Sequence, residues 1–286
     1  MKKIISFILL ILLTFALAGC SIKNISKFED KTEETTKEIP EKQIGRIITH
    51  ENFLTEFNKR VNLQDYDLEF TDYGHILNYV YSSKTDCEIK QSKSNFQVEI
   101  DGITVTLPLT VNEFVDLGFE LISMDNNIDA PVNLSTTERS ASFDVKTPRG
   151  NTFSIYTISK DYTPVPLKDL IVMQISCDFY EDTLNYGEGE RYDAPDINFF
   201  KNINGKSTVD SIIKELKTPR VIIFTQSLYN GKTTLADLQL TFDFSNQKYN
   251  GDICITAHTV LDENIKQTSY VSFLSYRIDY ESIKNN

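Results

Sequence analysis

The chain between residues 220 and 280 alternates apolar and polar residues in four successive runs. The run from 234 to 244 shows this most clearly, because its apolar residues fall on one face of a strand: Leu238, Leu240, Phe242 and Phe244. Such alternation indicates strands with one buried and one solvated face. The other runs cover 220–228, 252–261 and 268–280, and turn residues separate them: Asn230-Gly231, Asn250-Gly251 and Asp262-Glu263-Asn264. The pattern predicts a four-stranded antiparallel meander.

A short amphipathic helix is expected immediately before this meander. Thr208 is a suitable N-cap, and the apolar residues that follow have helical spacing: Val209, Ile212, Ile213 and Leu216. Pro219 ends the helix. We therefore expect this helix to lie on the apolar face of the sheet.

The same order of elements occurs earlier in the chain. Thr110 to Glu113 form a capping box before a short helix that stops near Gly118. Strand-like runs follow at 119–123, 139–147, 151–159 and 169–178, with a turn at Pro148-Arg149-Gly150. Thr110-Val111-Asn112 aligns with Thr208-Val209-Asp210, which predicts a tandem duplication.

The folded region opens with a further helix. Thr49 is its expected N-cap, and one apolar stripe follows: Phe53, Leu54, Phe57 and Val61. The sequence is poorly patterned from there to about Lys93. A hairpin is then expected over 96–107, because two alternating runs flank Asp101-Gly102.

The predicted fold class is α+β, a tandem repeat of a short helix packed on an antiparallel sheet of about four strands. We place the first unit at 49–182, including the N-terminal helix, and the second at 183–286. The pattern over about 94–280 resembles the β-lactamase-inhibitor-protein-like group and small outer-membrane-assembly lipoproteins. Those families usually have Gly after the final Leu of the helix, where this chain has Lys217. The resemblance implies a fold and assigns no binding residue.

The N-terminus predicts export. Lys2 and Lys3 precede an apolar run from Ile4 to Leu17, and the run ends in Leu-Ala-Gly before Cys20. This ending resembles the lipobox of bacterial lipoproteins of the Gram-positive surface type. It implies a signal peptide over 1–19, lipidation of Cys20 and anchoring at the extracytoplasmic face of the membrane. An uncleaved signal anchor is the alternative, although the apolar run is short for a membrane span.

Residues 20–48 predict a flexible tether, because they combine mixed charges with almost no aromatic residue. Its root-mean-square span is about 30 Å. The alternative is an extra helix on the fold, and the stretch from Ile44 to Ile48 is open as a strand or as the start of the folded part.

Charge limits the expected partners. Without residues 1–19 the chain has 27 basic and 41 acidic residues, a formal net charge of −14. Such a surface is repelled by nucleic acid and by anionic headgroups, so lipid on Cys20 has to provide the membrane attachment. The chain also has no Trp, which weakens a sugar-stacking hypothesis.

Three further cysteines, Cys87, Cys177 and Cys254, are too few and too sparse for a disulfide framework. Cys177 alternates with apolar residues on an expected strand and is interpreted as a small buried hydrophobe. One bridge among the three remains open. A Cys254–His258 dyad is disfavoured, because residues i and i+4 of a strand are about 13 Å apart.

Several short motifs suggest sites but lack essential residues. Gly205-Lys206-Ser207 and Gly231-Lys232-Thr233 each lack the upstream glycine of a phosphate-binding loop. The calcium-like series Asp125, Asn127 and Asp129 lacks the glycine and glutamate of that loop. The acidic segment from Glu181 to Asp196 is interpreted as a solvated linker. His50 is expected at a helix start, and neither His75 nor His258 completes a zinc spacing. We expect no metal, no cofactor and no catalytic residue.

We expect the protein to be a non-enzymatic module that binds an unknown protein partner at the cell surface. The predicted lipid anchor is the clearest feature of the sequence. Exposed sheet faces with Tyr270, Tyr276 and Tyr280 are one candidate binding surface. Core packing is the favoured role of these tyrosines, because they alternate with Ser and Arg on the opposite face. A cell-envelope hydrolase with a site between the two units is the alternative function. A small-ligand carrier ranks third, because the alternating helices of such binders are missing.

Overall fold

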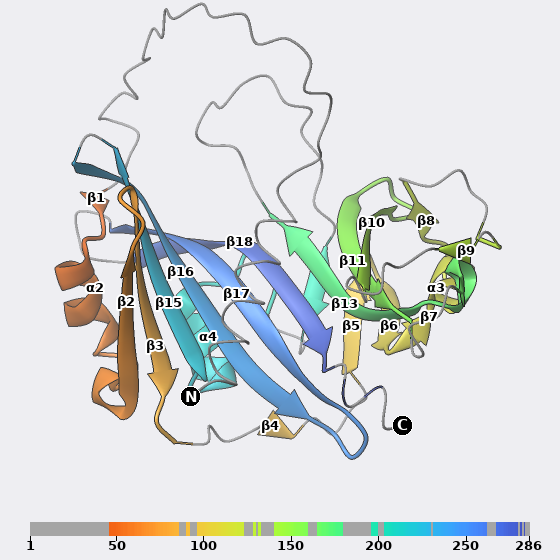
Figure 1. Ribbon diagram of the computed structural model, residues 1–286, viewed down its shortest axis with the longest axis horizontal. Coiled ribbons are helices and arrows are strands. Elements are labelled where there is room, and N and C mark those ends of the chain that lie inside the picture. Colours follow the sequence, from red (N-terminus) through yellow and green to blue (C-terminus); the bar gives the residue numbers. More distant parts are fainter. Residues whose placement is uncertain are drawn as a thin grey trace, which may run out of the picture. The chain divides into compact units, whose positions relative to one another are not determined.

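A computed structural model gives the arrangement of helices and strands in the unit Lys42–Asn286 (Figure 1). The structure describes residues 46–85, 90–91, 96–122, 128–129, 131–132, 140–159, 165–179, 196–199, 203–229, 231–261, 267–279, 281 and 283. The predicted signal peptide, Cys20 and the tether up to residue 45 lie outside these residues. No helix of the described part is long and apolar enough to cross a membrane.

The described helices are short and the strands are numerous. The helices are α2 (His50–Phe57), α3 (Val111–Asp116) and α4 (Val209–Leu216), with 3₁₀ turns η1 (Leu63–Asp65) and η2 (Leu167–Asp169). The strands of the first half are β1 (Arg46–Ile47), β2 (Tyr66–Asp72), β3 (Ile76–Ser83), β4 (Lys90–Gln91), β5 (Phe96–Ile100), β6 (Ile103–Leu107), β7 (Leu109–Thr110), β8 (Glu120–Leu121) and β9 (Pro131–Val132). Those of the second half are β10 (Ser140–Lys146), β11 (Thr152–Ile158), β12 (Val165–Pro166), β13 (Ile171–Asp178), β14 (Ile197–Phe199), β15 (Val221–Tyr229), β16 (Lys232–Ser245), β17 (Asn250–Leu261) and β18 (Gln267–Ile278).

A large sheet dominates the fold, with strand order β2-β3-β15-β16-β17-β18-β13-β11-β10-β8. All pairs along this path are antiparallel. A smaller sheet has the order β14-β5-β6, and β9 pairs with β12. The fold is thus mostly antiparallel sheet with few helices, which agrees with the broad α+β class.

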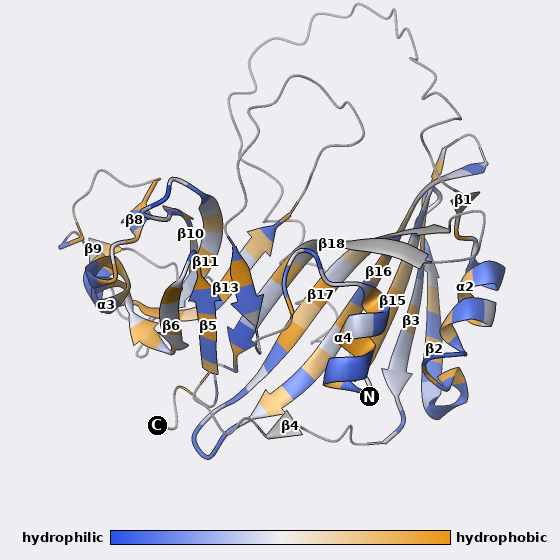
Figure 2. Ribbon diagram, turned by 180° about the vertical axis from the view of Figure 1, so that it is seen from behind, coloured by the Kyte–Doolittle hydropathy of each residue, from blue (hydrophilic) through white to orange (hydrophobic). Residues whose placement is uncertain are grey.

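One face of the large sheet carries the core. Ile222, Phe224, Leu238 and Ile255 on neighbouring strands are all nearly inaccessible to solvent. Helix α2 packs on this face through Phe53, whose ring stacks on Phe224 with centroids 4.3 Å apart. Figure 2 shows α4 in front of the strands on the same side, and its predicted stripe is buried at Val209, Ile212 and Leu216. Helices α2 and α4 therefore both stabilise this face.

The predicted helix starts are confirmed. Thr49 accepts a hydrogen bond from the backbone N–H of Asn52, and Thr110 and Thr208 each form a capping box. In the first box the Glu113 carboxylate accepts from the Thr110 backbone N–H at 2.7 Å. These hydrogen bonds satisfy donors that the first turn of a helix leaves open.

The hairpin β5–β6 is also confirmed, and its turn is a structural junction. Asp101 and Gly102 both have positive φ, as a tight two-residue turn requires. The buried Asp101 carboxylate accepts hydrogen bonds from Thr147 Oγ1 at 2.6 Å, Asn151 Nδ2 at 2.8 Å and the Asp196 backbone N–H at 2.8 Å. One side chain thus links the hairpin to the β10–β11 turn and to the start of β14.

Two details differ from the sequence predictions. The poorly patterned stretch contains the long strands β2 and β3, which pair over seven residues. Asn250-Gly251 begins β17, and the preceding turn is closed by a hydrogen bond from Asn246 N–H to Tyr249 C=O. Gly251 is required by close packing, because a Cβ there would lie 2.2 Å from the Arg277 carbonyl oxygen.

Candidate functional site

The large sheet has a second face that no described helix covers. Along β15, β16 and β17 the residues alternate between buried and partly exposed positions. The partly exposed set is predominantly polar and includes Thr225, Gln239, Thr241, Asp243 and Cys254. Figure 1 views the sheet with α4 behind these strands. We refer to this side of β3, β15–β18, β13 and β11 as the polar face.

Strand register brings small side chains into one row across the polar face. Thr241 pairs with Cys254, Cys254 with Ser275, Ser275 with Ser176, and Ser176 with Ser154. At the usual spacing of about 4.8 Å between strands, five strands give the row a length of about 19 Å. We call these five residues the small-residue row. Thr241 and Ser154, at the two ends of the row, are partly exposed, whereas Ser275 and Ser176 in its middle are only 6% and 5% exposed.

A row of charged residues lies beside the small-residue row and consists of Arg220, Asp243, Asp252 and Arg277. Arg277 pairs through its Nη2 with Asp252 Oδ2 at 2.5 Å, and Arg220 Nε pairs with Asp243 Oδ1 at 2.7 Å. Arg220 Nη2 lies 4.0 Å from the same Asp252 oxygen, which links the two pairs. Burial alone would lower the pKa of Arg277, but Asp252 outweighs it and raises that pKa, so the guanidinium stays charged. The row is therefore a fixed, paired array of charges.

The thiol in the small-residue row is not activated. Gln239 Nε2 lies 2.8 Å from Cys254 Sγ. Burial raises the pKa of the Cys254 thiol to about 11, so it is protonated at neutral pH and a poor nucleophile. The side chain of His258 lies outside the described residues. Cys177 is buried on the core face, as predicted, and both Cys177 and Cys254 are free thiols; Cys87 lies outside the described residues.

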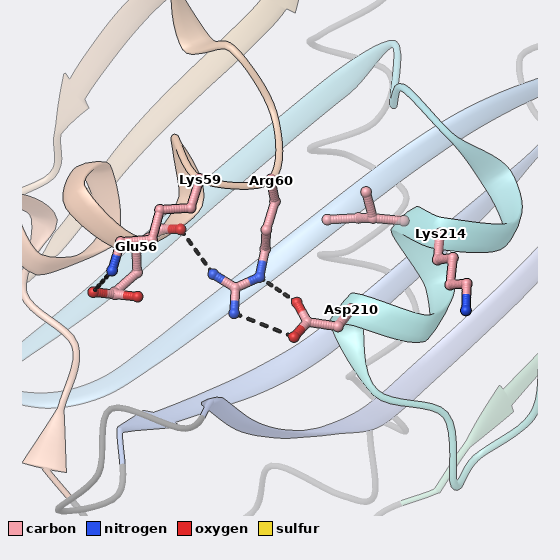
Figure 3. Close-up of a pocket in the computed structure, with 6 residues that line it drawn as sticks. Glu56, Lys59, Arg60, Asp210 and Lys214 are labelled. Carbon is pink, nitrogen blue, oxygen red and sulfur yellow. Dashed lines mark hydrogen bonds and ion pairs between the residues drawn. The ribbon is translucent and has the colours of Figure 1, made fainter.

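A shallow cavity lies on the helical side, between the end of α2 and the start of α4 (Figure 3). Its volume is about 420 Å³, and it is lined by Glu56, Lys59, Arg60, Asp210, Ile213 and Lys214. Arg60 binds both carboxylate oxygens of Asp210 and donates through Nη1 to the Glu56 carbonyl at 2.7 Å. Lys59 is paired with Glu56 at 2.8 Å. These contacts hold two helices together, which is a structural role.

Aromatic side chains gather near the start of α2. The His50 ring stacks on Tyr79 with centroids 3.7 Å apart, and its Nε2 is 2.9 Å from the Tyr81 hydroxyl. Burial lowers the pKa of His50 and raises the pKa of Tyr81 to about 12, so both are neutral at pH 7. His50 is the first residue of α2, and Thr49 is its cap.

For Tyr276 the core-packing role is confirmed and the exposed-surface role is wrong. Tyr276 is fully buried on the core face, where its ring packs 5.5 Å from Phe96, so it does not belong to an exposed binding surface. Its neighbours along β18 with odd numbers, Ser275 and Arg277, face the opposite way. The side chain of Tyr270 and the whole of Tyr280 lie outside the described residues.

The glycine-lysine motifs occupy turns. Gly205 lies close to Phe179, because a Cβ at position 205 would be 2.4 Å from the Phe179 ring. The Asn204 side chain accepts a hydrogen bond from the Lys206 backbone N–H in the same turn. Gly231 lies in the turn between β15 and β16 with φ of 71°. Both glycines therefore have conformational roles.

The remaining candidate residues are dispersed. Asp129 accepts a hydrogen bond from Lys168 Nζ at 2.7 Å, while Asp125, Asn127 and the acidic residues between 181 and 195 lie outside the described residues. His75 is exposed in the turn between β2 and β3. Within the described part no group of three His, Cys, Asp or Glu side chains is placed to hold a metal ion.

Exposed sheet faces were proposed from sequence as a binding surface, but the small-residue row on the polar face was not predicted. Alternation in 234–244 indicated a solvated face, but the small-residue row depends on pairing between β11 and β13 and between β13 and β18, which have no local sequence signal. Predicting that Thr241, Cys254 and Ser275 lie side by side requires the exact register of each strand pair, which the sequence does not determine.

Comparisons with known proteins give no identification. The chain matches no protein-family model, and searches of curated proteins and of solved structures found no significant match.

Proposed function

We propose that the chain is a membrane-anchored extracytoplasmic lipoprotein that binds another protein through the polar face. The observation that carries the proposal is the contrast between the two faces of the sheet. Helices bury one face, whereas the other combines a small-residue row with fixed charges across neighbouring strands. Such a surface suits a protein partner, because paired charges and hydroxyl groups give specificity without a deep pocket.

The lipoprotein part of the proposal rests on the sequence. The sequence has an export signal, then the Leu-Ala-Gly-Cys ending and then a polar tether. Anchoring through acylated Cys20 requires this order. With a net charge of −14 the mature chain has no electrostatic attraction to anionic headgroups, which makes lipid the supported means of attachment.

The tandem arrangement belongs to the proposal as well. Helix α3 is followed by β8, β10, β11 and β13, and helix α4 by β15 to β18, which supports two units of one helix and four strands. Both four-strand series follow chain order in the sheet, and their last strands, β13 and β18, pair with each other. This is the arrangement expected from a resemblance to the β-lactamase-inhibitor-protein-like group.

The alternative of an envelope hydrolase gains no support from the described side chains. Asp243 and Asp252 are bound by arginines, and Cys254 has a raised pKa. None of these groups is poised as a base or nucleophile.

Site-specific photocrosslinking in cells that produce the full-length chain tests the proposed binding surface. A photoreactive amino acid at Thr241, in the small-residue row, should yield a discrete heavier adduct. The same amino acid at Lys214, exposed on the helical side, is the matched control and should yield none. Adducts of equal intensity at both positions, or at neither, would contradict binding through the polar face.

A blocking variant sharpens the test. With the photoreactive group at Ser154, the change Thr241→Arg places a long side chain at the other end of the row. We expect the adduct to disappear, while Lys214→Trp leaves it intact. An adduct that survives Thr241→Arg would show that the partner does not cover the row.

A further inference from the structure

Strand β2 is the edge of the large sheet and carries unusual exposed apolar residues. Leu68 and Phe70 are each 52% exposed, and Tyr73, directly after the strand, is 55% exposed. These are three of the five large hydrophobic residues that are exposed in the described part of the chain. Natural edge strands are seldom both long and apolar, because they invite pairing with another chain.

The backbone hydrogen-bonding groups of Leu68 and Phe70 face away from β3. Tyr73 N–H donates to the Ile76 carbonyl and Lys84 N–H donates to the Asp65 carbonyl, so the odd-numbered residues of β2 face β3. The N–H and C=O groups of Leu68 and Phe70 therefore point away from the sheet. Among the described strands only β3 pairs with β2.

The side chains of β2 divide by chemistry between the two faces. Leu68 and Phe70 lie on the face that carries the core, and the Phe70 ring lies 4.9 Å from Tyr79. The apolar surface thus continues into the rings packed at the start of α2. Asp67 and Glu69 lie on the opposite face; Lys84 approaches Asp67 at 3.7 Å, but the Asp67 side chain remains 80% exposed.

We propose that the outer edge of β2 binds an extended segment of another protein that alternates apolar and basic residues and adds as a further strand. Backbone hydrogen bonds to Leu68 and Phe70 would give affinity, and the side chains would give specificity. Apolar residues of the segment pack against Leu68 and Phe70, while its Lys or Arg residues face Asp67 and Glu69. This surface is the outer edge of β2, which is not one of the strands of the polar face, although Asp67 and Glu69 lie on the same side of the sheet as that face.

Charge selects this occupant over a second copy of the chain. Two β2 strands side by side would bring Asp67 and Glu69 of each copy together, and like charges across strands are destabilising. The surplus of acidic residues in the whole chain adds to that repulsion and also opposes an anionic lipid surface. A basic and apolar segment is complementary to both faces of β2 at once.

Binding of a defined peptide to the full chain tests the proposal. The probe is a fluorescent seven-residue peptide of alternating Lys and Val, with a control peptide of the same composition in two blocks. We expect the alternating peptide to bind, measured by fluorescence anisotropy, and Leu68→Thr combined with Phe70→Thr to weaken it by about tenfold or more. Equal binding of the block peptide would overturn the proposal, because it would show attraction by charge alone.

Matched variants separate β2 from general surface effects. Ile122 is 50% exposed and remote in sequence, so Ile122→Thr removes similar apolar area and should leave binding unchanged. Glu69→Lys should weaken binding, whereas Glu99→Lys, at an exposed position of β5, should alter it less than about twofold at moderate salt. Circular dichroism verifies that each variant is folded. Equal losses from β2 variants and their controls would overturn the proposal.

N-methylation of the peptide examines strand addition itself. Methyl groups on alternate amides remove the donors on one side of the strand. We expect one of the two methylated sets to abolish binding and the other to retain it. Equal effects of the two methylated sets on binding would overturn the proposal. Two further results would also overturn it. One is that the chain binds lipid vesicles but not the peptide, and the other is that the chain forms a dimer in sedimentation that Leu68→Thr combined with Phe70→Thr dissociates.

Discussion

At the scale of single residues, Asp101 combines burial, charge and an unusual backbone conformation. Burial alone would raise the pKa of its carboxyl, but hydrogen bonds from Thr147, Asp196 and Asn151 outweigh this effect and lower the pKa. A lowered pKa means that the charged form stabilises the fold. The contribution is complete above the ordinary value of about 4 and is lost as the pH falls through the folded-state pKa.

We predict that Asp101→Asn lowers the free energy of unfolding at pH 7 by about 2 kcal/mol. Asn tolerates the positive φ of this position, so the change isolates the charge and its hydrogen bonds. Urea unfolding from pH 7 down to pH 3 should show the difference between the two proteins shrinking below pH about 4. A difference independent of pH would refute the role of the carboxylate charge.

Lys217 is a second residue with a backbone conformation that its side chain does not favour. It ends α4 with φ of 67° and ψ of −128°, a region that glycine adopts with much less strain. We predict that Lys217→Gly raises the free energy of unfolding by about 1 kcal/mol, because relief of strain exceeds the added entropy of the unfolded chain. Lys214→Gly, in the same helix, should lower it by about 1 kcal/mol. Destabilisation by both changes in urea titrations would contradict the prediction.

The resemblance had already marked position 217, where glycine was expected. The structure explains the expectation in physical terms, since Lys217 adopts the conformation that glycine would supply. Core packing of Tyr276 was expected from sequence, because alternation places Ser275 and Arg277 on the other face of the strand. The residues that cover Tyr276, such as Phe96, are seen only in the structure.

At the scale of elements, the helix caps offer a comparison between the two halves of the fold. Thr110 and Thr208 each accept from the N3 backbone N–H, at 3.2 Å in both helices. We predict that Thr110→Ala and Thr208→Ala each cost about 1 kcal/mol in chemical unfolding, while the corresponding Ser variants cost less. If Ala and Ser variants were equally stable, the hydroxyl groups would not contribute as caps.

Helices with caps and strands joined by short turns were predictable from sequence because their signals are local. Strands β2 and β3 were not, because their exposure does not alternate as that of β16 does: four successive residues from Asp67 to Phe70 are exposed. The pairing of β3 with β15 joins Ser82 to Val221, and no local pattern indicates a partner so distant in sequence. The candidate binding surfaces depend on these long-range pairings, so they emerge only from the structure.

At the scale of the whole molecule, the proposed anchoring of both binding surfaces at the membrane depends on the Cys20 sulfur. We predict that Cys20→Ala abolishes incorporation of labelled palmitate and the globomycin-sensitive mature form, because lipidation requires the Cys20 sulfur. Cys87→Ala is the matched control and should retain both. Mass spectrometry of the mature N-terminus provides an independent measure. Palmitate retained by Cys20→Ala would show that another residue is acylated, and a mature N-terminus without lipid would show that Cys20 is not; either outcome would refute anchoring through Cys20.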